Sequence, residues 1–162
     1  MPTRLLFVCL GNICRSPSAE NIMNHLLEQQ QLTDRIICDS AGTSSYHIGS
    51  EPNRRMVAAA GKKGITLTGS ARQFTKSDFQ DFDLILAMDR SNYKDILSVA
   101  GADSKELGAE QKVKLMCDFC CDHDDSEVPD PYYGGEAGFD YVIDLLTDAC
   151  KGLLEEVKAG SF

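Results

Sequence analysis

The sequence lacks any apolar run long enough to cross a membrane, and it lacks repeats, low-complexity stretches and linkers rich in proline or serine. A membrane helix needs about 20 successive apolar residues, whereas the run at residues 5–10 has six. That run is also too short for the hydrophobic part of a secretion signal, and no small-residue cleavage site follows it. We therefore expect a single domain over residues 1–162, located in the cytoplasm and without a membrane partner.

Basic residues are few, and one region has none. Acidic residues outnumber basic ones by 25 to 16, and residues 115–150 contain ten acidic residues but no lysine or arginine. A protein that binds nucleic acid needs a stripe of basic side chains to replace the counterions of the phosphates. The charge pattern therefore excludes nucleic acid as the main partner.

A disulfide framework is also excluded, because the cysteines number seven and no secretion signal precedes them. An odd number in a reducing compartment indicates free thiols, one of which can be reactive. The chain does not need disulfides for stability. Its 162 residues, 43% of them hydrophobic, can bury about 70% of the surface exposed by the unfolded chain.

Four short, continuous apolar runs predict strands that are covered on both faces. These runs are residues 5–9, 36–41, 84–88 and 113–116. Helical stripes of apolar residues separate or follow the strands: Ala19, Ile22, Met23, Leu26 and Leu27; Met56, Val57 and Ala60; Tyr93, Ile96 and Leu97; and a long stripe from Phe139 to Val157. The alternation predicts an α/β fold with a parallel sheet and helices on both faces, in which ligands bind beyond the carboxyl ends of the strands.

The segment after the first strand carries the chemistry. It begins at Cys9 and contains Gly11 and Asn12, residue types that tolerate left-handed backbone. Ser16 and Pro17 follow as a predicted N-cap and first helical residue. A tight loop at a helix N-terminus turns backbone N–H groups inward, and the helix dipole adds positive potential. The segment is therefore predicted to bind an anion of the size of a phosphate.

Cys9 and Arg15 lie at the two ends of this loop. The planar guanidinium of Arg15 can hold two phosphoryl oxygens at once, and the positive surroundings favour the thiolate of Cys9 over its thiol. A thiolate that attacks phosphorus also needs an acid to protonate the leaving oxygen. No histidine is near in sequence, and we expect His25, His47 and His123 at the surface. Asp130, between two prolines, is the candidate, although a turn aspartate would look the same.

Four motifs together resemble the low-molecular-weight protein tyrosine phosphatases. They are residues 8–17, 39–43, 88–89 and 130–133, which read VCLGNICRSP, DSAGT, MD and DPYY. The resemblance covers the whole chain. It implies a four-stranded parallel sheet with helices on both faces, flavodoxin-like and of the phosphotyrosine phosphatase I type. It further implies hydrolysis of phosphotyrosine in proteins, and of aryl phosphates, through a phosphocysteine intermediate, without metal or cofactor, by a monomer.

The resemblance also implies roles for individual residues. The nucleophile, the phosphate-binding arginine and the general acid match Cys9, Arg15 and Asp130. The phosphate-binding loop matches Leu10, Gly11, Asn12, Ile13, Cys14 and Ser16, with Ser40 in support. Cys14 matches a cysteine that can form a reversible disulfide with the nucleophile. Tyr46, Tyr132 and Tyr133 match aromatic residues of the substrate cleft. Gly69 is a departure, because many family members have a histidine at this position that supports the loop asparagine.

Two other functions fit parts of the pattern. An arsenate reductase would share the scaffold, Cys9 and Arg15, but it needs resolving thiols and no protonating acid. A phosphate-binding module without turnover would need neither a nucleophile nor an acid. Cys117, Cys120, Cys121 and His123 resemble part of a metal site, but no second pair of metal ligands follows, so we expect them in a solvated loop. Asp89 is expected as a helix N-cap.

Overall fold

The computed structural model describes all residues, 1–162, and contains the predicted parallel sheet. Its strands are β1 (Thr3–Cys9), β2 (Ile36–Gly42), β3 (Leu84–Ala87) and β4 (Val113–Leu115), in the order β2-β1-β3-β4. All three pairings are parallel, which confirms the prediction from the four apolar runs. The observed ends differ from the predicted ones by at most two residues.

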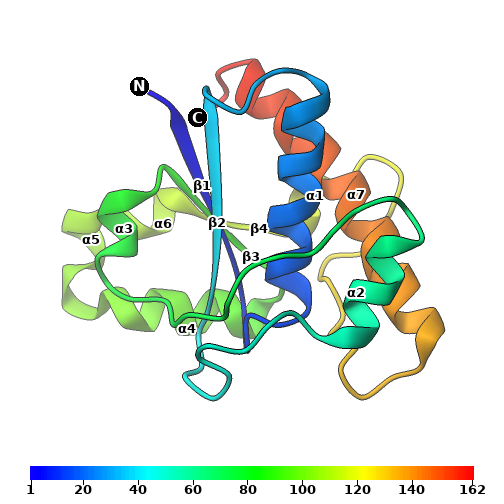
Figure 1. Ribbon diagram of the computed structural model, residues 1–162. Coiled ribbons are helices and arrows are strands. Elements are labelled where there is room, and N and C mark those ends of the chain that lie inside the picture. The colour runs from blue at the N-terminus through cyan, green and yellow to red at the C-terminus, as the bar shows by residue number, and fades with distance from the viewer.

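Helices cover both faces of the sheet, as Figure 1 shows. On one side are α1 (Arg15–Gln29), α2 (Arg54–Gly61) and α7 (Glu136–Lys158). On the other side are α3 (Asp78–Asp81), α4 (Arg90–Ala100), η1 (Gly101–Asp103), α5 (Ser104–Leu107) and α6 (Ala109–Lys112). The short helix η2 (Met116–Phe119) follows β4 and packs against α7.

The central strand β1 divides the apolar core into two clusters. Leu5 and Phe7 belong to the cluster of α1, α2 and α7, whereas Leu6 and Val8 belong to the cluster of α3 and α4. All four side chains are fully buried. Alternate residues of a strand point to opposite faces, so a strand covered on both faces must be apolar throughout. Each buried side chain of this size contributes about 1.5–3 kcal/mol.

The helical stripes face the core as predicted except at Val57, and Tyr93 and Leu97 on α4 are partly buried. The predicted residues of α1 are buried, as are those of α7 except Val157, which is partly buried. Val57 on α2 is exposed instead, because only Met56, Ala59 and Ala60 of this short helix face the core. Gly152 marks the closest packing of α7, since a Cβ there would lie 1.9 Å from the carbonyl oxygen of Phe119.

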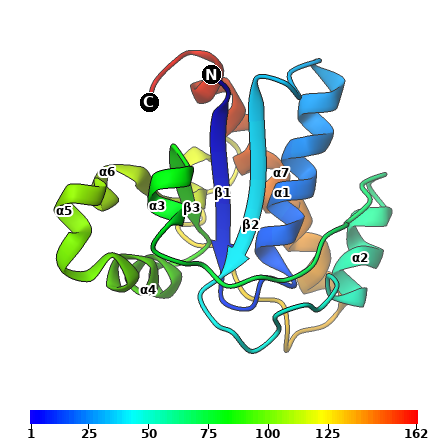
Figure 2. The ribbon, with the colours of Figure 1, turned by 60° about the vertical axis from the view of Figure 1, so that its left-hand side comes forward.

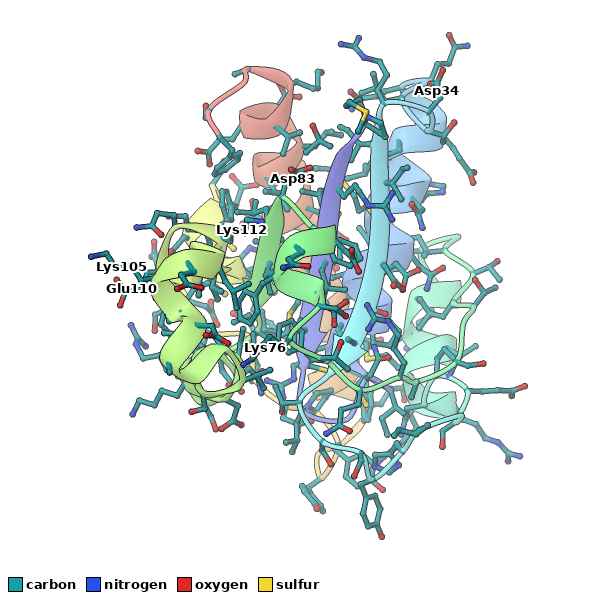
Figure 3. All side chains as sticks on the ribbon, turned by 90° about the vertical axis from the view of Figure 1, so that its left-hand side faces the viewer. Asp34, Lys76, Asp83, Lys105, Glu110 and Lys112 are labelled. Carbon is teal, nitrogen blue, oxygen red and sulfur yellow. The ribbon has the colours of Figure 1, made fainter.

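Two lysines join the short elements on the face of α3 and α4, seen in Figure 3. Lys112 Nζ donates to the carbonyl oxygens of Phe79 and Phe82. Lys76 Nζ lies 2.8 Å from a carboxylate oxygen of Asp103. These contacts stabilise helices of only three or four residues, which would be unstable alone.

The loops that follow the strands gather at one end of the sheet, and both chain termini lie at the other end (Figure 2). The predicted location of a binding site is therefore on the side away from the termini. None of the helices combines the length and the apolar character required to span a bilayer.

Candidate active site

The loop between β1 and α1 is held in one conformation by its own residues. Asn12 has a φ of 57°, the left-handed backbone expected for it. Gly11 has no positive φ and is needed for a different reason: a Cβ there would lie 2.9 Å from His47 Cδ2. Gly42, at the end of β2, is needed for close approach too, because its Cβ would lie 2.8 Å from the carbonyl oxygen of Leu10.

Cys9 lies at the floor of this loop, with only 2% of its surface exposed. Its Sγ is 3.0 Å from Ser16 Oγ and accepts a hydrogen bond of 3.3 Å from the backbone N–H of Asn12. A thiolate needs such donors when it is removed from water. The prediction that Ser16 is the N-cap and Pro17 the first helical residue is wrong, because α1 already begins at Arg15 and the Ser16 hydroxyl faces the sulfur instead.

The Asn12 side chain connects the loop to its surroundings. Its Nδ2 donates to Ser16 Oγ (2.8 Å) and to Ser40 Oγ (3.0 Å), and its Oδ1 accepts from the backbone N–H of Arg72 (3.0 Å). Ser40 Oγ in turn donates to Glu20 Oε1 at 2.6 Å. Burial raises the pKa of Glu20. Glu20 and Arg72 thus belong to the support of the loop, although no local pattern in the sequence indicates this.

Gly69, where the resemblance implies a histidine, lies beside this network. It lines a small polar cavity of about 60 Å³ together with Asn12, Glu20 and Ser40. The three hydrogen bonds of the Asn12 side chain are nevertheless complete, since the backbone of Arg72 supplies one donor and two hydroxyls act as acceptors. The support of Asn12 therefore does not need a histidine at position 69.

Arg15 is buried among acidic and carbonyl oxygens. Its Nη1 donates to Asp89 Oδ2 (2.6 Å) and to the carbonyl oxygen of Val128 (3.0 Å), and its Nη2 lies 3.6 Å from Asp130 Oδ2. Burial alone would lower the pKa of Arg15, but the neighbouring Cys9 and the two aspartates outweigh it and raise the pKa. The guanidinium is therefore charged at any physiological pH.

The two carboxylate oxygens of Asp89 bond to different partners. Its Oδ1 accepts from the backbone N–H of Asn92 and caps α4, as predicted. Its Oδ2 holds Arg15, which the sequence does not indicate. The residue therefore links the start of α4 to the phosphate-binding loop.

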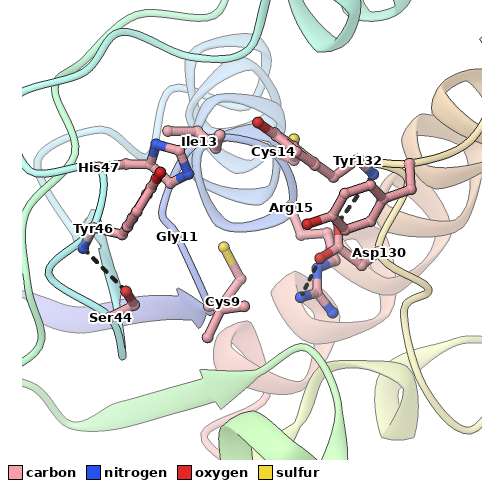
Figure 4. Close-up of a pocket in the computed structure, with 12 residues that line it drawn as sticks. Cys9, Gly11, Ile13, Cys14, Arg15, Ser44, Tyr46, His47, Asp130 and Tyr132 are labelled. Atoms are coloured by element: carbon pink, nitrogen blue, oxygen red, sulfur yellow. Dashed lines mark hydrogen bonds and ion pairs between the residues drawn. The ribbon is translucent and has the colours of Figure 1, made fainter.

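A cleft of about 370 Å³ opens above Cys9 (Figure 4). Asp130 lies on its wall, with 39% of its side chain exposed and its Oδ1 accepting from the backbone N–H of Tyr132. The residues that line the cleft are Cys9, Leu10, Gly11, Ile13, Cys14, Arg15, Ser44, Tyr46, His47, Asp130, Tyr132 and Tyr133. A cleft of this size accommodates a small organic ligand. The structure thus brings the three predicted catalytic residues and the three predicted tyrosines together.

His47 also lines the cleft, whereas the sequence pattern predicts a surface histidine. Its ring contacts the ring of Tyr46 edge-on, with centroids 4.8 Å apart, and lies 6.3 Å from that of Tyr132. The signal that could have identified it is its position directly after Tyr46, a residue that the resemblance assigns to the cleft. Figure 4 shows Tyr46 and His47 on the opposite side of Cys9 from Tyr132 and Asp130.

Cys14 is buried at the inner side of the same cleft. Burial, together with the nearby Cys9, raises the pKa of its thiol to about 12. Cys14 is therefore a thiol at neutral pH.

Residues 120–123 form a loop that is exposed or half-buried, as predicted, and one carboxylate holds it in place. One carboxylate, Asp148 on α7, accepts from the backbone N–H groups of Cys121, Asp122 and His123 at 2.9–3.0 Å and from the His123 ring at 2.8 Å. Burial acts to raise the pKa of Asp148, but these bonds outweigh it and lower the pKa to about 2. The same contact raises the pKa of His123.

These features define a class of enzyme. A buried cysteine sulfur at a strand end, a helix N-terminus beneath it, an adjacent guanidinium and an aspartate on the wall of the same cleft are the parts required for covalent hydrolysis of a phosphate ester.

Comparison with known proteins identifies the family within that class. The sequence matches the low molecular weight phosphotyrosine protein phosphatases over residues 4–161. A Synechocystis protein with the same family name is 58% identical over 93% of this chain and 94% of its own. The enzyme from Gallus gallus is 40% identical over 94% of each chain. The structure of an Entamoeba histolytica protein tyrosine phosphatase has a TM-score of 0.92 at 45% identity and covers 99% of both chains.

The chain therefore belongs to the low molecular weight phosphotyrosine protein phosphatase family. It is a protein tyrosine phosphatase, and the cysteine-based, metal-independent mechanism follows from the family.

Proposed function

We propose that residues 1–162 form one catalytic domain in which Cys9, Arg15 and Asp130 hydrolyse phosphotyrosine in proteins. The observation that supports this most strongly is the placement of the three side chains around one cleft, with Arg15 bonded to Asp89 and within 3.6 Å of Asp130. The E. histolytica structure holds Hepes in its active site. Hepes carries a sulfonate, and we expect a phosphate ester to bind here in the same manner.

In the first step, the phosphoryl oxygens bind to the backbone N–H groups of residues 10–15 and to the Arg15 guanidinium. Cys9 Sγ bonds to phosphorus as the bond from phosphorus to the tyrosyl oxygen breaks. Asp130 gives its proton to the leaving phenolate. Tyr46 and Tyr132 pack against the phenyl ring from opposite sides of Cys9, and Tyr133 extends the wall beside Tyr132.

In the second step, water attacks the phosphorus of phosphocysteine and gives a proton to ionised Asp130. The bond between sulfur and phosphorus breaks, so that Cys9 leaves as a thiolate and inorganic phosphate is released. Ser16, 3.0 Å from the sulfur, stabilises that thiolate. Asn12 and Ser40 keep Ser16 and the loop backbone in place throughout.

The test is hydrolysis of p-nitrophenyl phosphate with and without a chelator, followed by a series of aryl phosphates with leaving groups of increasing pKa. Cys9→Ser should reduce activity to background, because a hydroxyl is scarcely ionised at neutral pH. Asp130→Ala should slow the poorest leaving groups most, by about 100-fold or more. Equal slowing of all leaving groups would contradict the role of Asp130. Arsenate reduction without phosphatase activity would instead support the reductase alternative.

We further propose that Cys14 protects Cys9 against oxidation. Peroxide converts the Cys9 thiolate to a sulfenic acid, and the Cys14 thiol then forms a disulfide with it and releases water. A dithiol reductant restores both thiols. We expect dilute peroxide to inactivate the enzyme reversibly, and Cys14→Ser to make the loss less reversible. Mass spectrometry that found no link between Cys9 and Cys14 after oxidation would contradict this proposal.

We also propose a cytoplasmic location and action as a monomer on phosphotyrosyl proteins, with neither nucleic acid nor membrane as a partner. The seven cysteines are all free thiols, which suits a reducing compartment. The excess of nine acidic residues disfavours contact with a polyanion.

A further inference from the structure

The loop that carries Asp130 has few contacts with the rest of the molecule. In this acid loop, defined as residues 129–135, two hydrogen bonds are internal: Tyr132 N–H to Asp130 Oδ1 and Gly134 N–H to the carbonyl oxygen of Pro131. Arg15 reaches Asp130 itself at 3.6 Å. Apart from the backbone N–H of Gly138, which donates to the carbonyl oxygen of Gly135 at the start of α7, every other polar contact between this loop and the rest of the chain is made by one side chain, Arg55.

Arg55 holds the acid loop at two points. Its Nη2 donates to the carbonyl oxygen of Tyr132 (2.7 Å), and its Nη1 donates to that of Gly134 (2.8 Å). The guanidinium also lies over the ring of Phe139, 4.6 Å from the centroid. A planar fork with two parallel donors suits this arrangement, and an ammonium group could not reproduce it. The stacking fixes the plane of the fork, so the exposed side chain is restricted to one orientation.

The other end of Arg55 is attached to the phosphate-binding loop. Arg55 is in the first turn of α2, which is capped by the Asn53 side chain through bonds to the N–H groups of Arg55 (2.9 Å) and Met56 (3.3 Å). The Asn53 backbone N–H donates to the carbonyl oxygen of Ile13 at 2.8 Å. One short path of hydrogen bonds therefore runs from the phosphate-binding loop through Asn53 and Arg55 to the acid loop.

We propose that Arg55 is a positioning residue for proton transfer by Asp130. It fixes the acid loop relative to the phosphate-binding loop, so that the Asp130 carboxyl stays within reach of the leaving oxygen. The inference rests on the proposed role of Asp130. It assigns Arg55 no contact with the phosphate, and it makes the effect of Arg55 depend on the presence of the Asp130 carboxyl.

The experiment compares kcat/KM for phenyl phosphate, a poor leaving group, with that for p-nitrophenyl phosphate, a good one. Misplacement of a catalytic group by about 1 Å can reduce the rate up to about 100-fold. For an exposed anchor we expect Arg55→Ala to lower kcat/KM for phenyl phosphate about tenfold, and for p-nitrophenyl phosphate about threefold or less. The inhibition constant of inorganic phosphate should change less than about twofold, because the phosphate-binding loop is intact.

Matched variants separate position from charge and from folding. Arg54→Ala removes the neighbouring arginine, whose exposed side chain makes no hydrogen bond or ion pair, and should leave the rates on both substrates unchanged. Arg55→Lys keeps the charge but loses the fork, so it should resemble Arg55→Ala. In an Asp130→Ala background, Arg55→Ala should add less than about a twofold loss, because the group that it positions is gone.

Three results would overturn the inference. The first is an equal loss on both substrates with weaker phosphate binding, restored by Arg55→Lys, which would mean that Arg55 acts through its charge. The second is the same loss with and without Asp130, which would mean a general structural role. The third is full activity of Arg55→Ala. If Asp130→Ala itself shows no dependence on the leaving group, the proposed role of Asp130 fails instead, and this outcome is visible without any Arg55 variant.

Discussion

Two segments border the cleft, and they are held in different ways. Residues 9–16 form a loop whose main bonds join its own side chains and backbone: Asn12 N–H to Cys9 Sγ, Asn12 Nδ2 to Ser16 Oγ, and Ser16 Oγ to Cys9 Sγ. Residues 120–135 have no helix or strand and few internal bonds. They are held by contacts from outside the segment: Asp148 bonds to one end and Arg55 to the other, and Tyr141, Arg90, Met88 and Arg15 bond to residues 125–128 between them.

The difference corresponds to two demands of the chemistry. The loop at Cys9 must present several N–H groups and a sulfur in one fixed geometry, since preorganised donors stabilise the transition state only if they need not move. The loop at Asp130 must bring a carboxyl close to substrates of various shapes and then receive a water. A loop fixed by its own bonds suits the first demand, and a loop held by contacts from other elements suits the second.

The largest expected effect comes from Asn12, which the first segment needs for both its bonds and its backbone. Asn12→Ala removes the acceptor of the Arg72 N–H and the donor to two hydroxyls. The alanine must also adopt a φ of 57°, a left-handed conformation that its methyl side chain cannot stabilise by hydrogen bonds. We expect kcat/KM to fall about 100-fold and the free energy of unfolding to fall by about 3 kcal/mol. Steady-state kinetics and urea unfolding measure the two quantities.

Asn12→Gly is the matched control, because glycine adopts left-handed backbone without strain. It should recover about 1 kcal/mol of stability relative to Asn12→Ala, but little activity, since the side-chain bonds remain absent. If Asn12→Ala keeps wild-type activity, the phosphate-binding loop is not held by its own residues, and the contrast between the two segments is lost.

The same contrast decides what the sequence can predict. The sheet and the helix faces are determined by runs and stripes of apolar residues, such as Leu5 to Cys9, whose burial dominates the energy. The phosphate-binding loop is readable as well, because its signals are local: Cys9 at a strand end, Gly11 and Asn12 in the turn, and Arg15 at the helix start. Its errors are also local, such as Ser16, whose hydroxyl bonds to sulfur rather than to a helix N–H.

The contacts of the second segment are not readable from local patterns. Arg55 is 79 residues from Gly134, and Asp148 is 25 residues from His123. Glu20 and Arg72, which support the first segment, cannot be predicted from local patterns either, because each bonds to a partner that only the fold brings near. An arginine on a helix surface and an aspartate on a long amphipathic helix look like ordinary solvated residues, and only the tertiary structure shows that they are anchors.

A smaller effect is expected from Asp148, which anchors the N-terminal end of residues 120–135. Its pKa of about 2 lies below the usual value of an aspartate, so its stabilisation is complete above about pH 4 and is lost as the pH falls towards 2. His123 has a raised pKa, so its contribution is complete below about pH 6.5 and is lost as the pH rises through that higher value. Asp148→Asn should therefore lower the free energy of unfolding most between about pH 4 and 6.5, by about 2 kcal/mol.

Urea unfolding at several pH values checks this prediction, with Asp144→Asn as the control. Asp144 lies one turn earlier on α7, is exposed, and has a single ion pair of 3.6 Å with Lys63, so its loss should change stability by less than about 0.5 kcal/mol. Because Arg55 still holds the acid loop, the ratio of kcat/KM for phenyl and p-nitrophenyl phosphate should remain within about twofold of wild type in Asp148→Asn. A large change in that ratio would mean that residues 120–135 move as one unit, so that either anchor alone is insufficient to position Asp130.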